Sequence, residues 1–207
     1  GKTISGEGTV TVTGSHSSTD LSNITSAVLD ITGATLTSPT LPSSVASGDE
    51  LKITAAQISA ATIAGEGTIT VSGSHSSTDL SNITPALLDI SGATLTSPTL
   101  PSSVASGDIL TLTAAQANSA SITNSGTVRI ELSASAALAA SSDIDAITGT
   151  IAFVESDAPT VAVTTLSVAS GQTLTISAAQ VSGKTISGEG TVTVTGSHSS
   201  TDLSNIT

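Results

Sequence analysis

The chain has no cysteine, methionine, tryptophan or tyrosine, and Phe153 is its one aromatic residue. Without cysteine it cannot build a disulfide framework, a thiol nucleophile or a cysteine-ligated zinc site. Four basic residues stand against sixteen acidic ones, for a net charge of −12. The basic face and stacking aromatics that nucleic-acid binding needs are therefore missing. No apolar run approaches the roughly 18 residues needed to cross a bilayer, so we expect no membrane insertion of this segment.

Small side chains dominate the 207 residues, which include 38 serines, 36 threonines and 18 glycines. Disordered chains share that bias, but they lack β-branched apolar residues. Here 37% of residues are hydrophobic, and most of them are Val, Ile, Leu and Ala alternating with polar residues. That alternation predicts a folded, all-β chain.

The sequence repeats itself at two periods. Residues 1–25 recur letter for letter at 183–207, and within that long period SHSSTDLSNIT at 15–25 returns at 74–84. A third, diverged copy carries five extra residues in the Ala/Ser-rich stretch around 133–142. We therefore expect one continuous solenoid over 1–207, with sub-repeats 1–59, 60–118 and 119–182, and 183–207 restarting the first repeat.

Each 59-residue unit contains three short segments with apolar residues at i and i+2, beginning with Val10/Val12, Leu29/Ile31 and Leu51/Ile53. Successive segments lie about 18–22 residues apart, which predicts coils of that length and three coils per unit of about 59–64 residues. Short alternating strands separated by Gly, Ser, Asn and Asp corners are typical of a parallel β-solenoid (β-helix). The coil length and the lack of a hexapeptide rule favour a right-handed coil.

Two kinds of repeated polar or small residue have a structural explanation. Glycine recurs at one position of each repeat, where a positive φ or a tight corner is expected. Glutamine follows a repeated Ala-Ala pair, where its side chain is expected to bond to the backbone at a turn. These residues are Gly8, Gly67, Gly126 and Gly190, and Gln57, Gln116 and Gln180.

The segment SHSSTD places Ser, His and Asp within six residues, around His16, His75 and His198. A hydrolytic triad needs these groups to converge on one reacting atom beside an oxyanion hole. Copies of one surface turn do not provide that convergence, so we expect no catalytic residue and no enzyme. A carbohydrate-cleaving β-helix is also disfavoured, because no carboxylates converge in a side cleft.

Calcium is the strongest metal alternative, because acidic repeat proteins often bind it through carboxylates. Neither a GGxGxDxUx nonapeptide nor a DxDxDG loop is present. We therefore expect no metal or cofactor, with Asp143 and Asp145 as the calcium candidates if there is a site. The acids that suggest calcium are Asp49, Glu50, Asp108, Asp143, Asp145, Glu155 and Asp157.

Threonine runs such as TVTVT resemble the Thr-x-Thr faces of ice-binding solenoids. In the expected register, however, charged residues interrupt the row of outward-facing residues that stack from coil to coil (the outward file). Asp30 lies beside Lys52 in this row, and we expect the two to form a salt bridge between coils. An ice-binding face needs an uninterrupted file, so ice binding is disfavoured.

The units GEGTVTVTG, DLSNIT, GATLT and SGDELKITAAQ resemble the Ser/Thr/Gly-rich, cysteine-free tandem repeats of giant bacterial surface and secreted adhesin-type proteins. The resemblance implies an extracellular or cell-surface stalk or filament, and it carries over no catalytic residue. Since neither end differs from the middle, we expect an uncapped rod. Further copies would continue it head-to-tail in the same or another chain, and lateral bundling is compatible with that arrangement.

The alternative is a ligand-binding adhesin module for a glycan, a cell surface or calcium. Its site would be sought in the third unit, where Arg129, Phe153 and the five extra residues break the repeat.

Overall fold

The computed structural model of the chain describes residues 3–132, 144, 146–155, 165–168, 170–171, 173–197 and 199–207. It is all-β, with 54% strand and 7% helix, and its parallel sheet is stacked as a β-solenoid of about 8 turns. The fold class predicted from the sequence is therefore confirmed. The chain divides into two compact units, Gly1–Pro101 and Ser102–Thr207.

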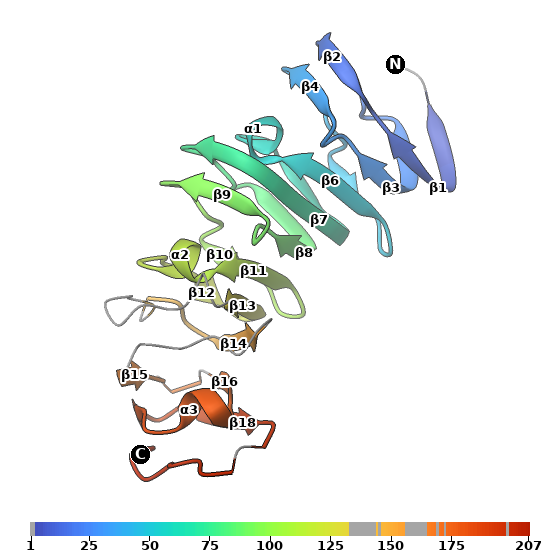
Figure 1. Cartoon of the computed structure of the whole chain (residues 1–207). Coiled ribbons are helices and arrows are strands. Elements are labelled where there is room, and N and C mark those ends of the chain that lie inside the picture. The colour runs from blue at the N-terminus through green and yellow to red at the C-terminus, as the bar shows by residue number, and fades with distance from the viewer. Residues whose placement is uncertain are drawn as a thin grey trace. The chain divides into compact units, whose positions relative to one another are not determined.

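The first unit is built from coils that each carry one or two strands (Figure 1). We name them the first coil (3–22), second coil (24–41), third coil (44–60), fourth coil (63–82) and fifth coil (83–100). Their elements are β1 (Ile4–Thr11), β2 (Gly14–Ser17), β3 (Ile24–Asp30), β4 (Ala34–Thr37), β5 (Ser44–Val45), β6 (Glu50–Thr54), α1 (Ala55–Ile58), β7 (Ile63–Ser76), β8 (Ile83–Asp89) and β9 (Ala93–Thr96).

The main sheet of the first unit has the strand order β1-β3-β6-β7-β8, and every pair in it is parallel. The paired positions are Val10 with Leu29, Leu29 with Leu51, Leu51 with Ile69, and Ile69 with Leu88. The spacing of these partners along the chain is the one expected from the sequence. The predicted coil length and the grouping of three coils in each repeat are thus confirmed in this unit.

The core of the first unit lies inside the coils, where alternate residues of each strand point inward. In β6, Leu51 is 1% exposed and Ile53 is completely buried, while the residues between and beside them are partly exposed. Stacked coils place each apolar residue on its counterpart in the next coil, so narrow aliphatic side chains fill the interior without aromatic rings.

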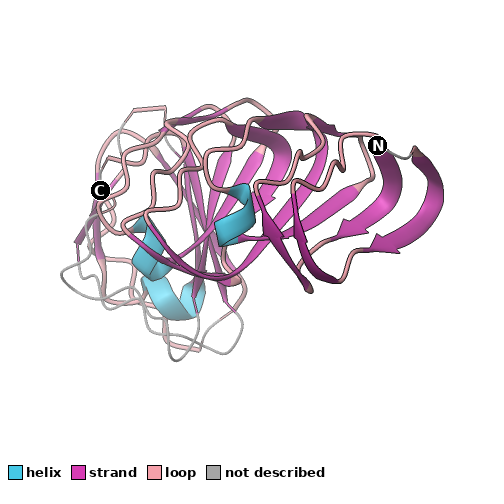
Figure 2. Cartoon of the chain, turned by 90° about the horizontal axis from the view of Figure 1, so that it is seen from above, coloured by secondary structure: helices cyan, strands magenta, loops and turns pink. Residues whose placement is uncertain are grey.

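The second unit repeats this construction. Its elements are β10 (Ser103–Val104), β11 (Ile109–Thr113), α2 (Ala114–Ala117), β12 (Thr123–Asn124), β13 (Thr127–Leu132), β14 (Thr150–Glu155), β15 (Thr165–Ser167), β16 (Thr173–Ser177), α3 (Ala178–Val181), β17 (Thr185–Ser187) and β18 (Thr191–Thr195). Parallel pairs join β11, β13, β14, β16 and β18 in that order, and also β10 to β12 and β15 to β17. Figure 2 shows the helices as short segments among the strands.

The insertion in the third repeat is visible in the strand register. Ile63 is joined to Ile83, whereas its counterpart Ile122 is joined to Ile147, which lies further along the chain than one ordinary coil. The longer step places the insertion between Ile122 and Ile147, as the sequence alignment of the repeats predicted.

Two of the repeated glycines, Gly67 and Gly126, serve close approach rather than a positive φ. A Cβ on Gly67 would collide with the carbonyl oxygen of Ala46, and one on Gly126 with that of Ala105. Neither glycine has a left-handed φ, whereas Gly65, two residues before Gly67, has φ +120°. The expectation of a glycine requirement is confirmed at Gly67 and Gly126, and its cause is the neighbouring coil's backbone.

Candidate functional site

In the third coil the helix α1 follows the main-sheet strand β6, at the place where the second coil has the strand β4. Thr54 caps α1: its hydroxyl accepts a hydrogen bond from the Gln57 backbone N–H at 3.4 Å. The Gln57 side-chain oxygen Oε1 in turn accepts from the Thr54 backbone N–H at 3.0 Å and from its hydroxyl at 2.9 Å. This reciprocal capping box stabilises a helix of only four residues that would not persist alone.

Gln57 also ties the third coil to the second. Its Nε2 donates to the backbone carbonyl of Ile31 at 3.1 Å and to that of Ala34 at 2.8 Å. The side chain thereby donates to two carbonyls of the second coil, of which that of Ile31 also accepts the Ala34 N–H at 3.1 Å. The predicted bond between Gln57 and the backbone at a turn is confirmed.

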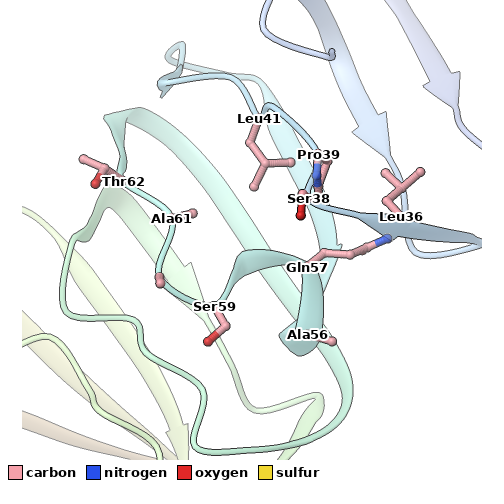
Figure 3. Close-up of a pocket in the computed structure, with 10 residues that line it drawn as sticks. Leu36, Ser38, Pro39, Leu41, Ala56, Gln57, Ser59, Ala61 and Thr62 are labelled. Atoms are coloured by element: carbon pink, nitrogen blue, oxygen red, sulfur yellow. The ribbon is translucent and has the colours of Figure 1, made fainter. Parts of the chain in front are cut away.

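Because α1 replaces a strand, β4 pairs with β2 on one side only. Between β4 with its following turn and the segment after α1 lies a hollow of about 430 Å³ (Figure 3). In the close-up, Leu36, Pro39 and Leu41 come from the second coil, and Ala56, Ser59 and Thr62 come from α1 and the segment after it. The lining comprises Leu36, Ser38, Pro39, Leu41, Ala56, Gln57, Ser59, Ala60, Ala61 and Thr62.

The hollow is lined by uncharged residues. None of its lining residues carries a charge, so it offers neither a general acid or base nor a carboxylate for a metal ion. Its polar side chains are hydroxyls and one amide, and Ser59 Oγ already accepts the Asp79 backbone N–H at 3.0 Å. The hollow can therefore take up water or a small neutral polar group, but it cannot perform acid–base chemistry.

The acidic residues of the first unit do not form a metal centre. Asp49 and Glu50 line a smaller hollow of about 110 Å³. Glu50 accepts a hydrogen bond from the Thr70 hydroxyl at 2.7 Å and lies 3.5 Å from Lys52 Nζ, so its carboxylate is already engaged. Across the part of the chain that the structure describes, no three His, Asp or Glu side chains are grouped to hold a metal ion. The calcium candidates Asp143 and Asp145 lie outside the described residues.

Aspartates close turns at the coil corners. Asp79 Oδ1 accepts the Ser81 backbone N–H at 3.0 Å, and Asp20 and Asp202 hold Ser22 and Ser204 in the same way. Hydrogen bonds from the backbone N–H and the hydroxyl of Ser81 lower the pKa of Asp79 below its ordinary value. These carboxylates therefore stabilise turns, and their charge faces solvent.

The Ser-His-Asp segment does not assemble into a triad in the fourth coil. His75 Nδ1 lies 2.9 Å from the hydroxyl of Thr78, which is completely buried, while Asp79 bonds to Ser81. His16 is exposed on β2. His75 is half-buried and lies in a strand, which departs from the expected surface turn, because β7 extends through it.

The third sub-repeat (119–182) offers no exposed aromatic residue. Phe153 is 8% exposed and pairs with Ile130 in the apolar file of β13 and β14, so it belongs to the core. Arg129 is half-buried on the outward side of β13, between Thr111 and Ala152. The ligand-binding alternative named Arg129, Phe153 and the five extra residues as the features that break the repeat, and of these Phe153 belongs to the core.

The outward file on the main sheet reads Thr11, Asp30, Lys52 and Thr70, in the register expected from the sequence. The prediction of an ion pair between Asp30 and Lys52 is wrong. Lys52 pairs with Glu50 two residues before it, and the Asp30 carboxylate accepts the backbone N–H of Thr32 at 3.0 Å and its hydroxyl at 2.6 Å. Lys52 and Asp30 thus each take a partner within their own coil.

Sequence reasoning missed the hollow beside α1. The coil length gave no signal that could have found it, since the step from Val10 to Leu29 is nearly as short as the step from Leu51 to Ile69 and still includes the strand β2.

No protein-family model, curated protein or solved structure matches the chain. Among the described residues, each helix has only four residues, so none of them could span a membrane.

Proposed function

We propose that the chain is a structural repeat segment of a long extracellular filament, fibre or surface stalk. In this proposal its coils continue head-to-tail into further copies of the repeat, in the same or another chain. The segment would give the filament length and stiffness, and any catalytic activity would lie in other parts of the assembly.

One observation carries the proposal, namely that the interface between coils is itself repeated. The pairing of β1 with β3 runs from Ile4–Ile24, with a register shift between Gly6 and Thr9. The pairing of β7 with β8 runs from Ile63–Ile83, with the same shift between Gly65 and Thr68. An interface that recurs in the same register from one repeat to the next can be extended by addition of more coils, as in other solenoid arrays.

Electron cryo-microscopy of the purified chain at high concentration tests the proposal. Continuous fibres with an axial layer spacing of ~4.8 Å are expected. Compact particles, or beads spaced as separate globular domains, at every concentration would contradict it. The extracellular location is tested separately, because antibodies raised against the chain should label intact cells of the source organism without permeabilisation.

A further inference from the structure

Main-chain hydrogen bonds join the first coil to the second at the corner that follows β2. The Ser18 N–H donates to the Thr37 carbonyl at 2.9 Å. The Leu21 N–H donates to the Thr40 carbonyl at 2.8 Å, and in the opposite direction the Thr40 N–H donates to the Thr19 carbonyl at 2.8 Å. This corner of the first coil is therefore a strand edge, and the second coil covers it with the segment ATLTSPTL.

The same three hydrogen bonds recur between the fourth coil and the fifth. The Ser77 N–H donates to the Thr96 carbonyl at 2.9 Å. The Leu80 N–H donates to the Thr99 carbonyl at 2.8 Å, and the Thr99 N–H donates to the Thr78 carbonyl at 2.8 Å. The covering segment of the fifth coil is again ATLTSPTL, so one sequence covers this kind of edge twice and with the same main-chain atoms.

The corresponding edge of the second coil has no strand against it. Gln57 takes its first carbonyl, that of Ala34, at 2.8 Å. Because the Thr37 carbonyl bonds to the first coil, the alternation of a strand directs the N–H and the carbonyl of Leu36 towards the third coil. Since β4 pairs with β2 alone, these two groups have no hydrogen-bond partner in the described part of the first unit.

Three more groups of this edge are open beyond the end of β4. In the register of the first two coils they are the counterparts of the three first-coil groups that the second coil covers. No protein group among residues 3–101 bonds to any of the three, which are the Ser38 N–H, the Pro39 carbonyl and the Leu41 N–H. Together with the two groups of Leu36 they form a row of main-chain donors and acceptors.

The hollow beside α1 lies along this row. Thr37 and Thr40, whose carbonyls bond to the first coil, do not line it. Figure 3 shows the second-coil lining across the hollow from the segment after α1. That lining consists of the four residues that carry the open groups, namely Leu36, Ser38, Pro39 and Leu41. The hollow is therefore the vacant place of a strand.

The apolar side chains of the edge are also incompletely covered. Leu41 is half-buried, whereas its counterparts Leu21 and Leu80, at the two paired corners, are 3% exposed and completely buried. Leu36 is half-buried as well. A strand placed in the hollow would bury more of these two leucines while it satisfied the open main-chain groups.

We propose that the hollow binds an extended, uncharged peptide segment of a partner protein, which adds as a parallel strand to residues 36–41. A strand edge recognises the main chain of its guest, and its donors and acceptors recur at the spacing of a peptide. The guest is uncharged because no lining residue carries a charge that could compensate a buried one. A guest of the ATLTSPTL type has main-chain groups that are already seen bonding to this kind of edge twice.

The size of the hollow fits this guest. A residue within a sheet occupies roughly 160 Å³, from the rise along a strand and the spacings between strands and between sheets. The hollow of about 430 Å³ therefore accommodates about three residues. Further residues of the guest can continue over the rim, where Ser38 and Thr62 are exposed. The site needs only the second and third coils, so it does not depend on the filament function.

Binding of a synthetic peptide to the full chain tests the proposal. The probe is acetyl-ATLTSPTL-amide, titrated into isotopically labelled protein and followed by NMR. Amide shifts are expected at residues 36–41 and 56–62, and they should saturate with a Kd of about 1 mM or below. No shift at these residues with about 5 mM peptide would overturn the proposal.

Peptides with one methylated main-chain nitrogen separate strand addition from other binding. In the second coil the Thr40 N–H bonds to the covered edge, so methylation of the last threonine of the peptide should weaken binding by about tenfold or more. The Leu36 N–H faces away from the covered edge, so the peptide methylated at its first leucine is the matched control and should bind within about threefold of the parent. Equal weakening by the two methyl groups would contradict a strand.

A substitution in the hollow locates the peptide. Ala61 is half-buried in the lining, so Ala61→Leu should fill part of the hollow and weaken binding by about tenfold. Ala64→Leu makes the same change at an exposed position of β7 outside the lining and should leave the Kd within about twofold. Unchanged binding to a folded Ala61→Leu variant would place the peptide elsewhere and overturn the proposal. If that variant does not fold, the methylated peptides decide on the native chain.

The remaining outcomes distinguish other occupants and the proposed function. Glucose that shifts the amides of 36–41, with no response to the peptide, would assign the hollow to a neutral sugar and overturn the proposal. Fibres with ~4.8 Å layers but no peptide binding would retain the filament and overturn the peptide site. Selective peptide binding in a chain that forms no fibre would support the site and contradict the filament role.

Discussion

At the residue scale, the closeness of stacked backbones decides which side chains the coils accept. Gly67 lies where the backbone of the third coil approaches the fourth, and any Cβ there would meet Ala46 and Val45. Gly8 occupies the same repeat position in the first coil, where nothing lies within 4 Å of an added Cβ. The same glycine therefore carries a steric constraint in one coil and none in another.

Gly67→Ala should lower the free energy of unfolding by about 1–3 kcal/mol, because the added methyl group forces two coils apart. Gly8→Ala is the matched control and should change it by no more than about 0.5 kcal/mol. Urea unfolding followed by circular dichroism measures both. Equal effects of the two substitutions would show that the collision at Gly67 is relieved elsewhere.

The aspartate turns predict a dependence of stability on pH. Hydrogen bonds from Ser81 lower the pKa of folded Asp79 below its unfolded value, so this carboxylate contributes stability above the unfolded value. That contribution is lost as the pH falls through the lowered value. Asp79→Asn should therefore have a lower urea midpoint than the native chain at about pH 6, and the gap between the two midpoints should narrow as the pH falls below about 4. A gap that is constant between these pH values would contradict the assignment.

At the element scale, α1 closes the third coil with hydrogen bonds instead of a strand pair. Thr54 and Gln57 satisfy each other's backbone groups, and Gln57 reaches the carbonyls of Ile31 and Ala34. The helix is thus both a corner and a link to the preceding coil. Its stability depends on two side chains, which makes the link easy to test.

Thr54→Ala should cost about 0.5–2 kcal/mol of stability through the lost cap. Gln57→Ala should cost more, because it also removes the amide donor to the Ala34 carbonyl and one of the two donors to the Ile31 carbonyl, which keeps the Ala34 N–H. Thr35→Ala, at an exposed position of β4, is a control expected to be nearly neutral. Thermal unfolding of the three variants measures their stability and so ranks the three substitutions. If Gln57→Ala is milder than Thr54→Ala, water replaces the amide in the hollow.

At the scale of the whole molecule, stability is shared between neighbouring coils. Ile69 is completely buried and pairs with Leu51 on one side and Leu88 on the other. Since each coil contacts the coils directly above and below, a defect in one coil acts first on its neighbours. Covered coils should therefore be more protected from local opening than edge coils.

Ile69→Ala should destabilise the chain by about 2–5 kcal/mol and reduce amide protection in β6, β7 and β8. Val10→Ala, at the same repeat position of the first coil, should reduce protection only in β1 and β3 and by less, since Val10 is half-exposed. Hydrogen exchange read by mass spectrometry measures both. A uniform loss of protection along the whole chain would show that the coils unfold as one unit.

The sequence by itself determined the coil architecture and its register. The alternation at Leu51 and Ile53 indicates which residues point inward, and the internal repeat predicts which residues of neighbouring coils stack on each other. Both follow from periodicity, because a strand has a side-chain period of two and a shift by one residue would expose the core.

Only the tertiary structure decided the partners of polar groups and the shape of the surface. Lys52 pairs with Glu50 rather than Asp30, Gln57 reaches across to the second coil, and a hollow lies where α1 replaces a strand. Such choices depend on distances of about 3 Å between side chains whose direction no sequence period specifies. The fold could therefore be predicted from the sequence repeat, whereas the hydrogen bonds and the hollow could be found only in the three-dimensional structure.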